Sequence, residues 1–165
     1  MQPKWSEFKL RVNINTPVET VYNAWATPGG LTSWFLRKAG FTTPGGEERK
    51  PSSHIAAGDQ YEWYWHGYPD SVLEKGKILS ANGKDQLSFT FSMGCPVNIS
   101  IYTEHGETIV ELVESNLPTD EETMLRHYVG DSKGWIFYLA NLKSVLEGGL
   151  DLRNKRNELT NVITS

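Results

Sequence analysis

The sequence predicts an α+β fold in which about six to seven antiparallel strands form a curved sheet around a long C-terminal helix. Three observations predict this fold. One strand with apolar residues at every second position is followed at once by an interrupted helical pattern. The middle of the chain holds short alternating runs separated by turn signals. An apolar pattern of period 3.6 then covers about residues 125–146 and ends at two glycines.

The first strand and the helices after it are predicted from local signals. Residues 8–14 alternate between apolar and polar side chains, which is the pattern of a half-buried strand. Thr16-Pro17-Val18-Glu19 predicts a helix start, with Thr16 as the N-cap, proline at the first helical position and glutamate at N3. Thr27-Pro28-Gly29-Gly30 interrupts this helix, and one further short turn of helix is expected over residues 31–34.

The middle of the chain is predicted to be an antiparallel meander. Residues 41–58, rich in Gly, Pro, Ser and charge, precede it and are interpreted as a mobile insertion or a functional loop. Asn82-Gly83 predicts a tight hairpin, because both central positions of the favoured turn need a positive φ. The strands are expected from residue 59, over 71–80, over 87–91, over 97–101 and over 108–114.

The aromatic run Tyr61-Glu62-Trp63-Tyr64-Trp65-His66 is the most informative strand. Side chains on a strand alternate between faces, so Tyr61, Trp63 and Trp65 share the predicted inner face, and the residues between them share the outer one. The rings can pack a solid core, or they can line a cavity that holds a ligand. Both interpretations are open from the sequence.

A long helix is predicted near the end of the chain. Thr119-Asp120-Glu121-Glu122 forms a second capping box, whose carboxylates complement the helix dipole rather than form a catalytic or metal-binding group. Gly130 and Gly134 lie inside the helix, where a kink or a close approach to the sheet is expected. Gly148-Gly149 can end the helix in a left-handed cap.

Length and charge restrict the possible classes of protein. A chain of 165 residues suits one domain, expected over residues 1–149, with a tail of unassigned role over residues 150–165. Basic residues are scattered and the net charge is −4, which argues against nucleic acid as a partner. No leader is expected in residues 1–5 and no membrane span elsewhere, and Cys95 has no second cysteine to pair with. We therefore expect a cytoplasmic protein that does not bind membranes.

Five segments between about Phe8 and Gly149 carry a combined family signal. They are Ala24-Trp25-Ala26-Thr27-Pro28-Gly29-Gly30-Leu31-Thr32-Ser33-Trp34-Phe35, Gly58-Asp59-Gln60-Tyr61, Gly76-Lys77-Ile78-Leu79, Leu87-Ser88-Phe89-Thr90-Phe91, and Gly134-Trp135 with the leucine pattern that follows to Gly148. Each motif is weak alone, but five in order are hard to obtain by chance. Together they resemble the activator of Hsp90 ATPase homologue 1-like (AHSA1-like) branch of the START/Bet v 1-like superfamily.

This resemblance implies a helix-grip fold, in which an incomplete antiparallel sheet grips the last helix and leaves an apolar cavity between them. It implies no shared catalytic residue set, so no active site is carried over, and no cofactor is expected. Two departures from the family pattern are an insertion around residues 44–53 and the tail after Gly149. Both are places where access to a cavity, or a surface for a partner, can differ.

No catalytic or metal-binding set is predicted from residue spacing. The histidines are His54, His66, His105 and His127. None is spaced from another as a local metal pair would be, so no metal is expected. Cys95 has no base beside it in the sequence and is interpreted as an inert or mildly reactive thiol. Glu62 and His66 share a strand face, but about 13 Å of strand separates them, which is too far for an acid-base dyad.

Aromatic side chains are predicted to converge on the space between the sheet and the last helix. They come from the early helices, from the middle strands and from the long helix. If they line a cavity, they are the candidate ligand-binding residues. These candidates are Trp25, Trp34, Tyr61, Trp63, Trp65, Phe89, Phe91, Trp135 and Leu139.

Three functions are compatible with these features. The first is non-enzymatic binding of a small hydrophobic or aromatic molecule in the cavity. The second, suggested by the family resemblance, is a protein-interaction module that modulates an Hsp90-type chaperone ATPase. The third is an enzyme of cyclase or hydrolase type, which would need a polar pair deep in the cavity, and the sequence names no convincing pair. Either a monomer or a homodimer is compatible with all three.

Overall fold

The computed structural model describes residues 4–163. Residues 1–3, on which part of the expectation about the N-terminus rests, and residues 164–165 of the tail lie outside the described residues. The elements in chain order are β1 (Glu7–Ile14), α1 (Val18–Ala26), α2 (Pro28–Trp34), β2 (Lys38–Thr42), β3 (Gln60–Tyr64), β4 (Leu73–Ala81), β5 (Gln86–Phe91), β6 (Cys95–Glu104), β7 (Glu107–Ser115), α3 (Glu121–Met124), the π-turn η1 (Leu125–Val129) and α4 (Gly130–Leu146).

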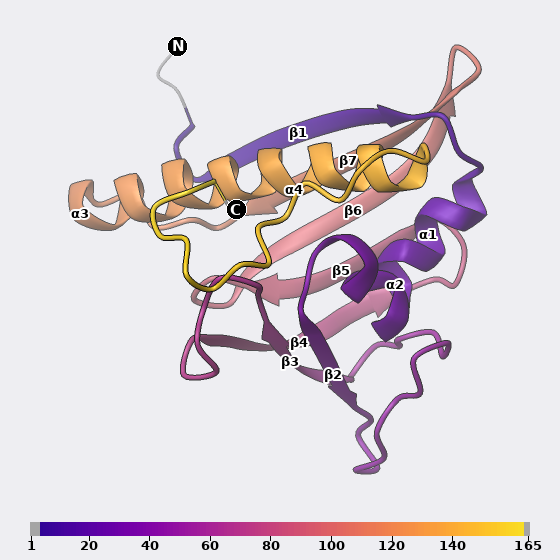
Figure 1. Ribbon diagram of the computed structural model, residues 1–165, viewed down its shortest axis with the longest axis horizontal. Coiled ribbons are helices and arrows are strands. Elements are labelled where there is room, and N and C mark those ends of the chain that lie inside the picture. Colours follow the sequence, from indigo (N-terminus) through magenta and orange to yellow (C-terminus); the bar gives the residue numbers. More distant parts are fainter. Residues whose placement is uncertain (1–3, 164–165) are drawn as a thin grey trace.

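One seven-stranded antiparallel sheet, in the order β1-β7-β6-β5-β4-β3-β2, forms the frame of the molecule. The sheet curves around α4, which lies along its concave side, while α1 and α2 close one end of the curve (Figure 1). The first strand closes the meander by pairing with the last, Phe8 opposite Glu114 and Val12 opposite Val110. The predicted α+β helix-grip fold is therefore confirmed.

The inner face of the aromatic strand is packed as the alternation predicts. Tyr61 and Trp63 are almost fully buried, and Trp63 contacts Phe35 edge-on with ring centroids 5.5 Å apart. Tyr64 points to the outer face, where Arg37 lies over its ring. Strand β3 ends at Tyr64, yet Trp65 stays on the inner side and also meets Phe35 edge-on.

Both predicted helix caps are displaced by one residue. Pro17, not Thr16, is the N-cap of α1 and makes no side-chain cap bond. The Thr16 hydroxyl instead donates to the carbonyl of Leu146, which ties the first helix to the end of α4. At the C-terminal helix the cap is Asp120 rather than Thr119. At α1 no side chain caps the helix, whereas at the C-terminal helix the Asp120 carboxylate accepts the N–H of Thr123 in place of Thr119.

The predicted hairpin at Asn82-Gly83 forms, but its turn is longer than the two-residue type. Only Gly83 has a positive φ, +74°. The Asn82 side chain accepts backbone N–H groups from Lys84, Asp85 and Gln86 at 2.9–3.0 Å. An Asx-type turn therefore replaces the expected turn with two left-handed residues.

The C-terminal helix is continuous from Glu121 to Leu146 but contains a π-turn just before Gly130. The kink expected near the helix glycines stays a prediction. The alternative expectation, a close approach to the sheet, is wrong, because a Cβ placed on Gly130 or Gly134 would meet no atom within 4 Å. The helix ends as predicted, with Gly148 in the left-handed region at φ +80°. Within residues 4–163, no helix is long and apolar enough to cross a membrane.

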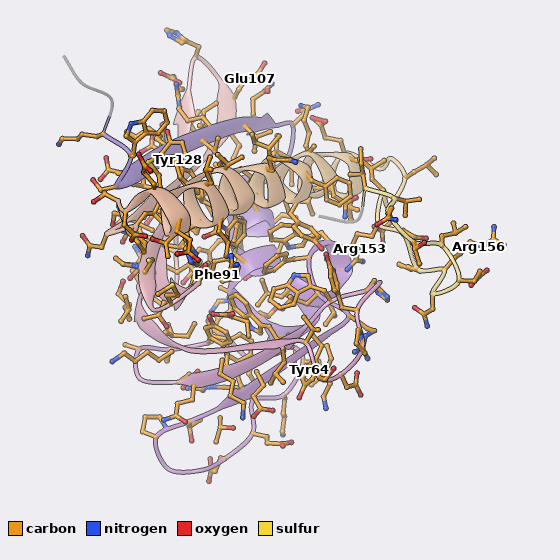
Figure 2. The ribbon with its side chains drawn as sticks, turned by 90° about the vertical axis from the view of Figure 1, so that its left-hand side faces the viewer. Tyr64, Phe91, Glu107, Tyr128, Arg153 and Arg156 are labelled. Carbon is orange, nitrogen blue, oxygen red and sulfur yellow. The ribbon has the colours of Figure 1, made fainter. Side chains whose placement is uncertain are left out.

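The start of the tail is fastened to the body of the fold. Arg153 is 8% exposed and donates to the carbonyls of Thr32, Ser33 and Leu36 at the C-terminal end of α2, at 2.9–3.1 Å. Asp151 pairs with the same guanidinium at 2.7 Å. Figure 2 shows Arg153 turned toward the helices and Arg156 turned outward. The boundary predicted at residue 149 stays a prediction, but the residues just after it hold α2 in place.

Replacing Arg153 with alanine is expected to lower the free energy of unfolding by about 2–4 kcal/mol, since charged hydrogen bonds to three carbonyls are lost and Asp151 loses one of its two cationic partners, the other being Lys155. The measurement is equilibrium unfolding in urea. The matched control is Arg156→Ala, whose exposed ion pair with Glu158 contributes less than about 1 kcal/mol. Equal losses in the two variants would contradict the role given to Arg153.

Candidate functional site

A pocket of about 670 Å³ lies between the first half of α4 and the facing end of the sheet. Its walls come from the end of α2, the loop after β3, the end of β5 and the beginning of the C-terminal helix. Figure 2 shows Phe91 close beneath α4, whereas Tyr128 lies on the other side of the helix, toward β1. The lining residues are Phe35, Trp65, Tyr68, Val72, Phe91, Arg126, Gly130, Asp131, Gly134, Trp135 and Tyr138.

Two glycines leave room for the pocket on α4. Gly130 and Gly134 are one helical turn apart on the pocket side, and a Cβ at either would stand in open space. Trp135 and Tyr138 follow on the same side of the helix and supply rings. The helix therefore presents a bare backbone beside aromatic walls, which is the arrangement that leaves a cavity unfilled.

The structure places three of the nine predicted site residues in the pocket wall and the other six outside it. Trp65, Phe91 and Trp135 line the pocket. The remaining six are buried at 3% exposure or less and pack into the core behind it. They are Trp25, Trp34, Tyr61, Trp63, Phe89 and Leu139.

The five aromatic residues among these six fill the interior because their rings meet one another. Tyr61 and Trp63 are stacked with centroids 3.8 Å apart, and Trp25 meets Trp34 at 4.6 Å. The aromatic convergence therefore provides both a packed core and one wall of a pocket. The assignment of any of the nine to a bound ligand stays a prediction.

The inner end of the pocket carries a pair of acidic side chains. Asp131 lines the pocket, and Glu114 is fully buried beside it. One oxygen of Glu114 accepts the indole N–H of Trp135 at 2.9 Å. Its other oxygen, Oε1, and Oδ2 of Asp131 are both buried and accept no hydrogen bond from another residue. The two carboxyl groups are hydrogen-bonded to each other when Glu114 holds a proton.

Other polar groups surround this pair. His127 shares a hydrogen bond with the hydroxyl of Ser92 at 2.9 Å, and its Nδ1 lies 3.7 Å from Oδ2 of Asp131. The backbone N–H of Ser92 donates to Glu74 at 3.0 Å. Ser92 has a left-handed φ of +40°, an unfavourable conformation that aims both of its polar groups at this cluster. The pocket thus has an apolar mouth and a polar inner end.

Burial shifts the pKa values of the acids in this cluster upward. Burial first, and the neighbouring charge of Asp131 second, raise the pKa of Glu114 from 4.5 to about 8. Burial is also the main cause that raises the pKa values of Asp131 and Glu74. At neutral pH Glu114 therefore holds a proton, and the pair can gain or lose one near physiological pH.

The sequence carried a signal for Glu114 that residue spacing did not bring out. Val110, Leu112 and Glu114 alternate on the inner face of β7, so the glutamate occupies an apolar register position. Asp131 stands one helical turn before Trp135, on the side that faces the sheet. Both acids could have been recognised as polar residues at inward positions. The π-turn that brings His127 toward Asp131 has no comparable signal.

The remaining candidates lie outside the pocket. Glu62 pairs with Lys75 at 2.7 Å on the outer face rather than with His66. Cys95 is buried, its thiol lies 3.5 Å from the carbonyl of Asn116, and burial raises its pKa. In the part of the chain that the structure describes, no three His, Cys, Asp or Glu side chains are grouped as a metal site requires.

Comparisons with known proteins give one family. The family described as "Activator of Hsp90 ATPase homolog 1-like protein" matches residues 15–147. No curated protein matches the sequence of the chain.

Solved structures show the same fold at low identity. Protein SSP2350 from Staphylococcus saprophyticus superposes with a TM-score of 0.69 at 19% identity, covering 89% of this chain and 96% of that one. The solution structure of the Aha1 dimer from Colwellia psychrerythraea has a TM-score of 0.66 at 18% identity, and the match covers 87% of this chain and 97% of that one. Protein BH1534 from Bacillus halodurans has a TM-score of 0.62 at 19% identity, and the match covers 86% of this chain and 96% of that one.

The raised pKa of Glu114 predicts how stability depends on pH. Between about pH 4.5 and 8 the folded state keeps a proton that the unfolded chain has lost. Unfolding therefore releases a proton, and stability falls as pH rises through this window, by up to about 1.4 kcal/mol per pH unit. Urea unfolding at a series of pH values should show this fall in the wild type.

Glu114→Gln should remove this component, since the amide keeps an acceptor for Trp135 and has no proton to lose. The control is Glu107→Gln, an exposed glutamate at the start of the same strand. If the wild type and Glu114→Gln lost stability in parallel from pH 5 to 8, the assignment of this proton to Glu114 would be wrong.

Proposed function

The chain belongs to the activator of Hsp90 ATPase homolog 1-like family, and on that premise we propose that it binds a small hydrophobic or aromatic molecule in the pocket between the sheet and α4. The observation that carries the proposal is the half-open aromatic pocket beside the two bare helix glycines. Its volume of about 670 Å³ lies within the range of small-molecule sites.

The chemistry of the walls supports an apolar ligand. Phe35, Trp65, Phe91, Trp135 and Tyr138 present ring faces and edges to the pocket. Each 100 Å² of apolar ligand surface removed from water against such walls contributes on the order of 2.5 kcal/mol before the costs of association. Edge-to-face and offset-stacked contacts with these rings would add to the affinity for an aromatic ligand.

A second candidate function, an enzyme on the same fold, is favoured by one observation. The Glu114–Asp131 pair is a polar pair at the inner end of the pocket, and the pKa of Glu114, raised to about 8, suits proton transfer near neutral pH. If a bound molecule is converted, product analysis by mass spectrometry will show it, and Glu114→Gln will stop the conversion while binding persists.

The family description also suggests an Hsp90-type chaperone ATPase as a protein partner. Leu125, Val129 and Ile136 are exposed on the outer side of the C-terminal helix and provide apolar surface for a protein contact. The measurement is the ATPase rate of a purified chaperone with and without the protein. If the ATPase rate is unchanged and the protein binds a small molecule, the chaperone role is excluded and ligand binding is retained.

Filling the pocket from the helix is expected to abolish binding without loss of stability. In Gly134→Leu the new side chain enters space that holds no atom within 4 Å of its Cβ. The affinity for the neutral apolar dye Nile red should fall at least about tenfold, measured by fluorescence titration. The free energy of unfolding should rise by about 0.5–1 kcal/mol, because leucine favours a helix interior more than glycine does.

The matched control is Ala140→Leu, which adds the same side chain on an exposed position of α4 outside the pocket. This variant should bind the dye as the wild type does. Undiminished binding by Gly134→Leu would place the dye elsewhere and remove the support for the pocket.

A further inference from the structure

The pocket wall contains one exposed charged side chain, the guanidinium of Arg126. We infer that the ligand of the pocket is an aromatic acid, whose negatively charged group pairs with Arg126 while its rings lie over Gly130 and Gly134. This inference rests on the proposed function and names the chemical class of its ligand. The geometry that carries it is an unpaired cation at one end of an apolar groove along the helix.

Arg126 begins a row of pocket-lining positions on the C-terminal helix. The row continues with Gly130, Gly134 and Tyr138, each four residues after the one before. The backbone N–H of Gly130 donates to the carbonyl of Arg126, so these two residues are one turn apart in spite of the π-turn. At about 1.5 Å per residue the row is roughly 18 Å long, which is enough for a small aromatic molecule. A ligand that lies over the two glycines therefore has Arg126 toward one end and Tyr138 toward the other.

Arg126 has no negatively charged partner within the part of the chain that the structure describes. No carboxylate oxygen there lies within 4.0 Å of its guanidinium nitrogens. By contrast, Arg37 is paired with Asp70, and Arg153 is paired with Asp151. A carboxylate on a ligand can accept two parallel N–H bonds from a guanidinium, which makes this pairing both strong and directional. The pocket therefore offers a binding group for an anion.

The acid pair at the inner end of the pocket does not offer a second charged group to a ligand. Glu114 and Asp131 are hydrogen-bonded to each other through the proton that Glu114 holds, and Ser92 and His127 lie beside Asp131. The two remaining carboxyl oxygens are out of contact with solvent. The negative charge that the pair keeps is therefore stabilised inside the protein. It also repels an anionic group from the inner end, which directs that group toward Arg126.

The far end of the row is polar but uncharged. Tyr138 lines the pocket and is 4% exposed. Burial is the main cause that raises the pKa of Tyr138, so its hydroxyl stays neutral at physiological pH. This hydroxyl can exchange a hydrogen bond with a neutral polar group of a ligand. The charged group of the ligand therefore belongs at the Arg126 end.

The walls between the two ends favour an aromatic body for the ligand. The rings of Phe91 and Trp135 lie 5.1 Å apart, and those of Phe35 and Tyr138 lie 4.8 Å apart, centroid to centroid. A flat ring system can lie against the bare helix backbone and meet these rings edge to face or in offset stacks. An aliphatic chain would bury similar surface without the contacts between rings.

The test uses two probes of the same shape, biphenyl-4-carboxylate and its neutral analogue biphenyl-4-carboxamide, as competitors of Nile red. In the wild type at low salt, the carboxylate should displace the dye at a concentration at least about threefold lower than the carboxamide, because only the carboxylate forms an ion pair with Arg126. In Arg126→Gln the affinity for the carboxylate should fall at least about fivefold, and that for the carboxamide less than about twofold. Arg126→Lys keeps the charge and should keep most of the affinity for the carboxylate.

Two controls separate an ion pair with the ligand from a general effect of charge. Lys133→Gln removes one positive charge from an exposed position of α4 outside the pocket wall. This variant should bind both probes within about twofold of the wild type, because its charge is separated from the ligand by solvent. Raising the salt concentration from about 0.05 M to 0.5 M should weaken the carboxylate and not the carboxamide, since a solvent-exposed ion pair is screened.

The outcomes separate the inference from the proposed function. If Nile red binds and Gly134→Leu blocks it, but the carboxamide competes as well as the carboxylate, the pocket has no preference for an acid and the inference is overturned. The same holds if Arg126→Gln weakens both probes equally, if Lys133→Gln weakens the carboxylate as much as Arg126→Gln does, or if neither probe displaces the bound dye. If Nile red does not bind at all, the proposed function itself fails.

Discussion

The position of one side chain, Trp135, connects every functional part of this molecule. Its indole is 2% exposed and lies 5.1–6.2 Å from the rings of Trp25, Phe35, Phe89 and Phe91, which belong to both early helices and to the sheet. Its N–H is bound to Glu114 on β7. Because the same ring is core, pocket wall and hydrogen-bond donor, the grip of the sheet on α4 also fixes the geometry of the candidate site.

The irregular part of the C-terminal helix has a physical role in this arrangement. A π-turn contains one residue more than an α-helical turn, and here it ends just before Gly130. The extra residue rotates the side chains before it relative to those of α4. His127 and Asp131 then lie on the same side, with Nδ1 and Oδ2 3.7 Å apart. Single π-turns of this kind are rare in helices and occur frequently at functional sites.

Much of the fold and little of the polar site could be predicted from the sequence. Period-two and period-3.6 patterns are local, and they placed the broken helix, the inward faces of Tyr61 and Trp63, and every strand except β2. Arg153 has no local pattern, because its partners are carbonyls of residues more than a hundred positions earlier. Glu114 lies at a position of β7 where the alternation calls for an apolar residue. From the sequence, a charged residue there indicates an interruption of the strand rather than a functional residue.

The choice between a filled core and a cavity shows where such patterns stop being informative. An inward ring has the same spacing in the sequence whether it meets another ring or an empty volume. What separates Trp63, packed at 3.8 Å against Tyr61, from Trp65 on the pocket wall is the surface opposite each ring. Opposite the pocket wall the helix presents Gly130 and Gly134, and the absence of two Cβ atoms leaves the space open. The helix glycines therefore determine that the aromatic layer continues as a pocket instead of a core.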